Sequence, residues 1–326
     1  TGALLGVLVF LAVYGVRVLD PTSVDWILNS LSPDPIQHYL GWELFRRSPV
    51  HLPYIGANYN AVYPFRTSVL FTDSLPLAAL FFKLLGGILP TRFQYFGWWG
   101  LLCYALQGGL AQAVIARIAG VQPTFGRDDK SKAAIAIIMS PGQTAKLWGS
   151  VLGAGVLVLF PALTIRMFAH TALAANWLVL LALYLWLRSD ELMPTTRRAC
   201  LIWGGVGLLC AGIHLYYLPM VGLVLVGYAV RRALQKRGFA AAMLPVAAFC
   251  VTALAELFLL GAFAVNFAGY SNGYLSGADV VNLFVPGIAA SWEQIVYAGL
   301  GTTLAVVLAL VCAAVHFSKA KAFFAA

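Results

Sequence analysis

The stretch YFGWWGLLCYALQGGLAQAVIARI, residues 95–118, decides the class of this protein. It carries no charge before Arg117, and about 20 apolar residues suffice for a helix to cross a bilayer. Eight further apolar runs lie along the chain, at residues 1–16, 74–90, 150–168, 172–187, 199–217, 218–230, 239–267 and 294–317. These runs lack the apolar–polar alternation of membrane strands, so the sequence predicts an all-α polytopic bundle.

Composition supports this class. Hydrophobic residues make up 61% of the chain and charged residues 10%, whereas soluble domains have about 45–50% and about 25%. The net charge of +9 is typical of basic cytoplasmic loops. No basic run is interleaved with aromatic residues as a nucleic-acid groove requires, so no nucleic-acid partner is expected.

The distribution of basic residues predicts the orientation of the spans. Lys and Arg gather in residues 119–149, 188–198 and 231–238, which the positive-inside rule places in the cytoplasm. Residues 17–94 then form a loop on the outer face, and residues 74–90 cannot cross the membrane. This run carries Lys83 in its middle, so we expect an interfacial helix with a snorkelling lysine. About eight spans remain, with outer-face juxtamembrane helices in the first loop.

The whole chain, residues 1–326, is predicted to form a single transmembrane domain. Its first residue, Thr1, lies inside an apolar run, and no closing motif follows Lys321. We therefore expect the natural protein to continue beyond both ends.

The densest polar pattern is SPDPIQHYLGWELFRRSP, residues 32–49. Asp34 precedes a proline, which predicts an N-cap followed by proline at the first helical position. On this helix Gln37 and His38 share a face with Asp34, and the apolar residues opposite are expected to lie on the membrane. As an alternative, Asp34 is only a cap and His38 an interfacial histidine.

Two more histidines reach the outer face in this topology. His170 lies at a tight turn between two spans, and His214 ends another span, followed by Tyr216 and Tyr217. Ionisable residues near the membrane interior are functional candidates because burying them is costly. The alternative is that both are interface histidines at helix ends. The aromatic remainder of the first loop fits either a sugar or headgroup site or an aromatic belt.

The arrangement resembles the GT-C superfamily of membrane glycosyltransferases, and within it an uncharacterised family of bacterial GT-C-like membrane proteins. The stretches that carry the resemblance are DPIQHYLGW at 34–42, FTDSLPLAALFF at 71–82, FPALTIRMFAHTALAANW at 160–177 and IHLYYLP at 213–219. The resemblance implies that Asp34 is the catalytic base or a metal ligand. His170 stands where many relatives have a second acidic residue, which is a departure from their pattern.

The resemblance further implies transfer of a sugar from a polyprenyl-phosphate donor to an unknown extracytoplasmic acceptor, at the outer face of a bacterial inner membrane. Asp34 and His38 are the expected catalytic residues, and Mg²⁺ or Mn²⁺ is a possible cofactor on Asp34. Membrane lipids would surround the spans. The expected substrate-binding residues are Gln37, Trp42, Arg66, Asp73, Arg92, His170, His214, Tyr216 and Tyr217, with Arg66 or Arg92 on the phosphate.

Two other functions remain open. A transporter or flippase of lipid-linked sugars would predict inverted repeats, and the sequence shows no internal repeat. A non-catalytic membrane scaffold would have no requirement for Asp34.

Overall fold

The computed structural model describes residues 1–59, 61, 66–121, 141–265 and 311. Within these residues the regular structure is helical, with one isolated bridge between Ala57 and Ser68. This confirms the predicted all-α class. Two compact units divide the chain, and the elements below belong to the first, which comprises residues 1–230 and 238–265. Only the end of α11 extends beyond it.

Three helices in the described residues are long and apolar enough to cross a membrane: α5 (Phe96–Ile118), α11 (Tyr217–Leu234) and α12 (Phe239–Leu259). Helix α1 (Gly2–Tyr14) is apolar but shorter. The structure thus supports a membrane protein with three candidate spans among the described residues, and the number of about eight stays a prediction. The predicted run 294–317 falls outside the described residues except at position 311.

Several predicted boundaries are wrong. Residues 150–168 do not form one helix but divide between α6 (Pro141–Val158) and α7 (Pro161–Ala169). Pro161 starts α7, and Phe160 before it is extended, because proline disfavours helical geometry in the preceding residue. The polar loop was expected to end at residue 149, but α6 already begins at Pro141, so the predicted loop ends too late.

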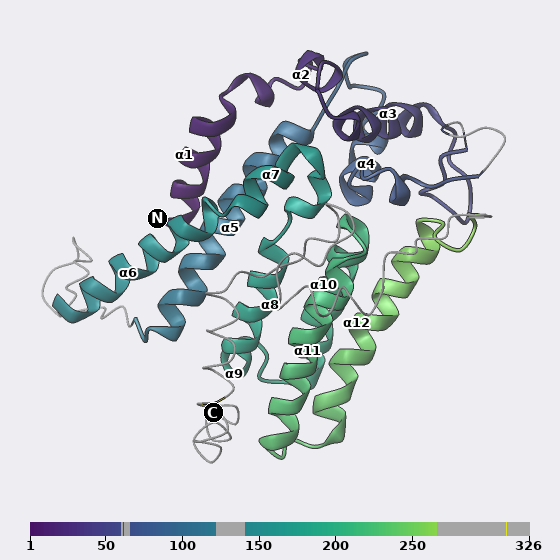
Figure 1. The fold of residues 1–326 in the computed structure, drawn as a ribbon. Coiled ribbons are helices and arrows are strands. Elements are labelled where there is room, and N and C mark those ends of the chain that lie inside the picture. Colours follow the sequence, from purple (N-terminus) through teal and green to yellow (C-terminus); the bar gives the residue numbers. More distant parts are fainter. Residues whose placement is uncertain (60, 62–65, 122–140, 266–310, 312–326) are drawn as a thin grey trace, which may run out of the picture. The chain divides into compact units, whose positions relative to one another are not determined.

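The later helices are also shorter or shifted. Residues 172–187 divide into η3 (Thr171–Ala174) and α8 (Trp177–Leu187), and residues 199–217 correspond to α10 (Thr196–Ile213). Helix α12 ends well before residue 267, at a turn where Gly261 has a φ of 81°. A left-handed glycine after a helix is a common terminator. Helices α10 and α12 pack side by side (Figure 1).

The first loop contains η1 (Arg17–Leu19), α2 (Asp25–Leu28), α3 (Pro33–Arg47), η2 (Val69–Phe71) and α4 (Pro76–Leu84). Helix α4 has nine residues and is about 13 Å long at 1.5 Å per residue. Because a hydrocarbon core is about 30 Å thick, α4 is too short to cross it. This agrees with the prediction that residues 74–90 do not cross the membrane.

Snorkelling of Lys83 stays a prediction, and the structure adds a contact of its side chain within the protein. Its Nζ donates a hydrogen bond of 2.8 Å to the Phe45 carbonyl and lies 3.9 Å from the centre of the Phe45 ring. Because the last carbonyls of a helix lack partners within the helix, a lysine can satisfy one of them. Lys83 thus joins α4 to the end of α3.

The apolar face of α3 packs against protein, whereas the sequence suggested contact with the membrane. Tyr39, Trp42 and Phe45 are buried, and only Leu40 among these apolar positions is exposed. The Trp42 indole donates to the Phe93 carbonyl at 3.0 Å and contacts the Tyr95 ring edge-on. The loop before α5 supplies these partners, which a helical pattern alone does not reveal.

Candidate functional site

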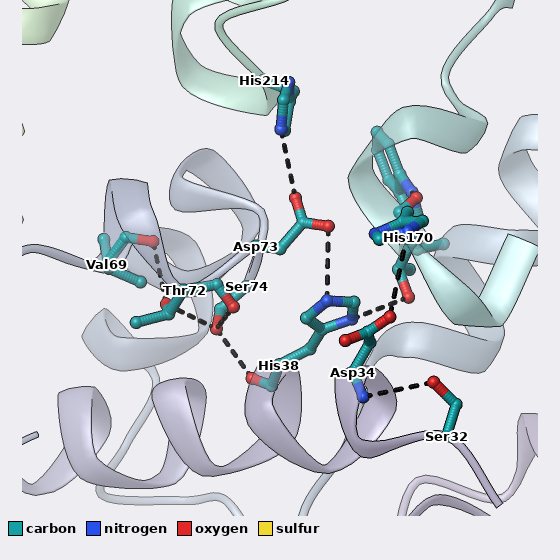
Figure 2. Close-up of polar contacts among 11 residues, drawn as sticks. Ser32, Asp34, His38, Val69, Thr72, Asp73, Ser74, His170 and His214 are labelled. Atoms are coloured by element: carbon teal, nitrogen blue, oxygen red, sulfur yellow. Dashed lines mark hydrogen bonds and ion pairs between the residues drawn. The ribbon is translucent and has the colours of Figure 1, made fainter. Parts of the chain in front are cut away.

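Two carboxylates and three imidazoles meet beside α3 (Figure 2). We call Asp34, His38, Asp73, His170 and His214 the Asp-His cluster. Helix α3 carries the first two, and the turn between η2 and α4 carries Asp73. His170 is the C-cap of α7 and His214 the C-cap of α10. The cluster therefore joins four segments that are distant in sequence, as expected for a site assembled by folding.

Asp34 is not the N-cap of α3, contrary to the sequence interpretation. Ser32 is the cap, and its hydroxyl accepts a hydrogen bond from the Asp34 backbone N–H at 3.4 Å, while Pro33 opens the helix. Proline is favoured at the first helical position, and the stretch SPDP offers two prolines. Asp34 lies in the first turn, where its carboxylate is 3.8 Å from His170 Nε2, and both side chains are 36% exposed.

Asp73 is the centre of the cluster. Its Oδ2 lies 3.3 Å from His38 Nε2 and its Oδ1 lies 3.5 Å from His214 Nε2. The Asp73 side chain is 15% exposed and that of His38 only 4%. Asp73 also has a φ of 54°, an uncommon left-handed conformation for a residue with a side chain.

The turn that holds Asp73 is fixed to α3 by hydrogen bonds (Figure 2). The Thr72 and Ser74 hydroxyls are 2.8 Å apart, and Ser74 Oγ donates to the His38 carbonyl at 2.7 Å. From the other side, the Tyr95 hydroxyl donates to the Ser74 carbonyl. These contacts hold Asp73 in its left-handed conformation.

Gly41 makes this close approach possible. A Cβ at this position would lie 2.4 Å from Thr72 Cβ and 2.6 Å from Ser74 Oγ. The backbone carbonyl of Gly41 also accepts a hydrogen bond of 3.0 Å from the buried Asn58 amide. Gly41 follows His38 by three residues, which puts both on one face of α3, and the turn that holds Asp73 rests on this face.

Burial controls protonation in the cluster. Burial and the negative charge of Asp34 raise the pKa of Asp73 to about 7. Burial also lowers the pKa of His38 to about 4. At neutral pH the His38 ring is therefore neutral, and its 3.3 Å contact with Asp73 is not an ion pair.

Two residues expected to bind substrate are placed as packing residues. Trp42 is fully buried, and Tyr217 is 1% exposed, with its hydroxyl donating to the Leu173 carbonyl at 2.6 Å. Aromatic residues with a polar tip occur both in binding sites and in cores. Burial, which the sequence does not give, distinguishes the two.

Three further candidates lie on the surface. Gln37 and Arg92 are exposed, and the exposed Arg66 has its guanidinium 5.4 Å from the centre of the Tyr59 ring. In the part of the chain that the structure describes, no contact joins these three side chains to the Asp-His cluster.

Tyr216 does contact the cluster. Its backbone N–H donates to His214 Nδ1 at 3.2 Å, and its ring meets the His214 ring edge-on at 4.7 Å. Sequence reasoning missed Thr171, which is 2% exposed and has its hydroxyl 3.4 Å from His38 Nδ1. Its position next to His170 was the only signal for it.

Across the described ranges, no three His, Cys, Asp or Glu side chains are arranged to hold a metal ion. A divalent cation here would need oxygen ligands from the substrate. Mg²⁺ is commonly held in this way, by one or two carboxylates together with substrate phosphates and water. Asp34 fits this use, because its carboxylate is partly exposed and has only a distant contact with His170.

Comparison with known proteins gives one relationship. No curated protein and no solved structure matches the chain. The model of one protein family matches residues 3–325, nearly the whole length. The chain therefore belongs to this family, which is described as a domain of unknown function (DUF6311).

Proposed function

We propose that this protein is a GT-C-type glycosyltransferase that moves a sugar from a polyprenyl-phosphate donor to an acceptor outside the cytoplasm. The observation that carries the proposal is the Asp-His cluster, in which Asp34 and Asp73 lie close enough for one charge to raise the pKa of the other carboxyl. Glycosyl transfer needs a group that takes the acceptor proton and groups that meet the phosphate. The partly exposed Asp34 and His170 can meet the phosphate.

A divalent cation, Mg²⁺ or Mn²⁺, would be held by Asp34 together with the donor. Such a cation neutralises negative charge on the phosphate leaving group. The histidines add donors that carry no charge when neutral, so the site can accept an anionic headgroup without a fixed ion pair.

We further propose eight spans in a bacterial inner membrane, with the Asp-His cluster on the outer face. Three of its members, Asp34, His38 and Asp73, belong to residues 17–94, for which the basic loops elsewhere predict the side opposite the cytoplasm. The surrounding spans would hold the polyprenyl tail and position its headgroup near Asp34.

Donor turnover tests the function. The purified chain, in lipid nanodiscs with Mg²⁺ or Mn²⁺, should release polyprenyl phosphate from at least one of a panel of polyprenyl-phosphate hexoses and pentoses, measured by mass spectrometry. Polyprenyl pyrophosphate sugars serve as the comparison donor. Turnover of none of these donors, or movement of intact donor between leaflets without cleavage, would contradict the proposal and favour the scaffold or the flippase, respectively.

The topology gives a separate prediction. In a variant without native cysteines, Leu52→Cys and Thr91→Cys should both react with a membrane-impermeant maleimide added to intact spheroplasts, because residues 74–90 do not cross. Leu52 and Thr91 are both exposed. Arg197→Cys, at an exposed position in the first turn of α10 within the basic segment 188–198, should react only after lysis. Labelling of only one of the two outer cysteines would overturn this topology.

A further inference from the structure

We propose that Asp73 is the base that takes the proton of the acceptor hydroxyl, with His38 and His214 as positioning residues whose Nε2 atoms lie against its two carboxylate oxygens. This assignment rests on the proposed glycosyl transfer and divides the work between the two carboxylates. Asp34 then meets the donor phosphate, and Asp73 meets the acceptor.

His214 is fixed as a donor by its neighbour. Its Nδ1 accepts the Tyr216 backbone N–H at 3.2 Å, so in the neutral ring the proton is on Nε2. That Nε2–H faces Asp73 Oδ1 at 3.5 Å. Both ring nitrogens are engaged, and His214 has no lone pair available for an acceptor proton.

His38 is excluded as a base by its burial. Its side chain is 4% exposed, and its two nitrogens face Thr171 Oγ1 at 3.4 Å and Asp73 Oδ2 at 3.3 Å. A substrate hydroxyl cannot reach it. When the Thr171 hydroxyl donates to Nδ1, the proton of the neutral His38 ring is on Nε2 and faces Asp73, as that of His214 does.

Asp73 combines access with basicity. It keeps 15% of its side chain exposed, between a buried histidine and the partly exposed His214. Its pKa of about 7, raised by burial and by Asp34, makes it a stronger base than an ordinary carboxylate. The titratable groups that act on it are the two neutral histidines beside its carboxylate and the Asp34 carboxylate.

The acceptor O–H bond breaks and its proton passes to a carboxylate oxygen of Asp73. The acceptor oxygen bonds to the anomeric carbon of the sugar, and the bond from that carbon to the phosphate oxygen breaks. Its electron pair leaves with the polyprenyl phosphate, and Asp73 later returns the proton to water.

Asp73→Asn tests the assignment with little disturbance of the fold. Asparagine is among the residues that best tolerate a positive φ, and it matches aspartate in size. We expect transfer in nanodiscs to fall by about 100-fold or more at every pH, the usual effect of losing a general base. Asp25→Asn, at an exposed carboxylate of α2, should keep the wild-type rate.

Infrared difference spectra between pH 5 and pH 9 give a readout without substrate. The wild type should show a carboxyl that titrates near pH 7, and Asp73→Asn should lose it. If this band persists in Asp73→Asn, the inference is overturned even when the wild type turns over no donor. If the wild type is active and Asp73→Asn keeps near-full activity, the inference fails while the proposed function stands.

Two substitutions test the positioning role of His214. Gln keeps an N–H near the position of Nε2, so His214→Gln should keep the midpoint of the carboxyl titration. His214→Leu removes this N–H, and the midpoint should move to higher pH because the N–H dipole no longer faces the ionised carboxylate. Equal midpoints in the two variants would contradict the positioning role of His214.

Discussion

Replacement of Asp34 by Asn is expected to lower the rate of sugar transfer by about 100-fold or more, while the free energy of unfolding changes by less than about 1 kcal/mol. The rate falls because the neutral amide lacks the charge that holds a cation on the donor phosphate. The fold tolerates the change because Ser32, not Asp34, caps α3. The substitution removes the favourable interaction of a first-turn carboxylate with the helix dipole and weakens a 3.8 Å, partly exposed contact with His170.

The comparison requires both quantities from the same preparations. Transfer from a polyprenyl-phosphate sugar and thermal unfolding are measured for wild type, Asp34→Asn and Asp25→Asn. The last variant is a matched control because Asp25 is also a first-turn carboxylate, in α2, and lies outside the Asp-His cluster. Any residual activity of Asp34→Asn should shift its pH midpoint downward, because the charge that raises the pKa of Asp73 is gone. Near-wild-type transfer by a folded Asp34→Asn would remove the main support for a glycosyltransferase.

Replacement of Trp42 by Ala is expected to destabilise the protein by about 3–5 kcal/mol, the usual cost of truncating a buried aromatic residue. Trp42 is fully buried in α3, donates a hydrogen bond to the Phe93 carbonyl and packs against Tyr95. Its loss leaves a cavity between α3 and the loop before α5, and leaves a buried carbonyl without its partner. Thermal unfolding in detergent or nanodiscs measures the effect.

The same experiment separates packing from substrate binding at this position. Trp148→Ala, at a tryptophan of α6 that is 59% exposed, should cost little stability. Trp42→Phe should recover part of the lost stability and keep the KM for the donor. A stable Trp42→Ala variant with a greatly raised KM would instead support the role in substrate binding that the sequence suggested.

Local patterns in the sequence determined the class of the protein and much of its helical content. Long apolar runs require helices in a membrane because every backbone N–H and C=O must be satisfied within the segment. For this reason α5 and the start of α12 were predicted closely. The short, lysine-containing α4 was likewise expected not to cross, since proline and charge limit an apolar run.

Helix boundaries were predicted less accurately where two nearby residues both favour the same position. In SPDP both Ser32 and Asp34 precede a proline, and both residue types favour N-caps. The structure selects Ser32, which leaves the Asp34 carboxylate unconstrained by capping. Similarly, hydropathy passes smoothly through Pro161, although the chain breaks there into α6 and α7.

The sequence by itself determined that Asp34 and His38 share a face of one helix, because residues four apart on a helix are neighbours. Only the tertiary structure placed Asp73 between His38 and His214 and buried Trp42 and Tyr217. The position of Asp73 depends on the turn that Ser74 and Tyr95 fix to α3, and on the contact that Gly41 permits. Such contacts join segments that are distant along the chain, and no periodic pattern in the sequence reveals them. The pKa of Asp73 depends mainly on burial, which arises only when these segments pack together.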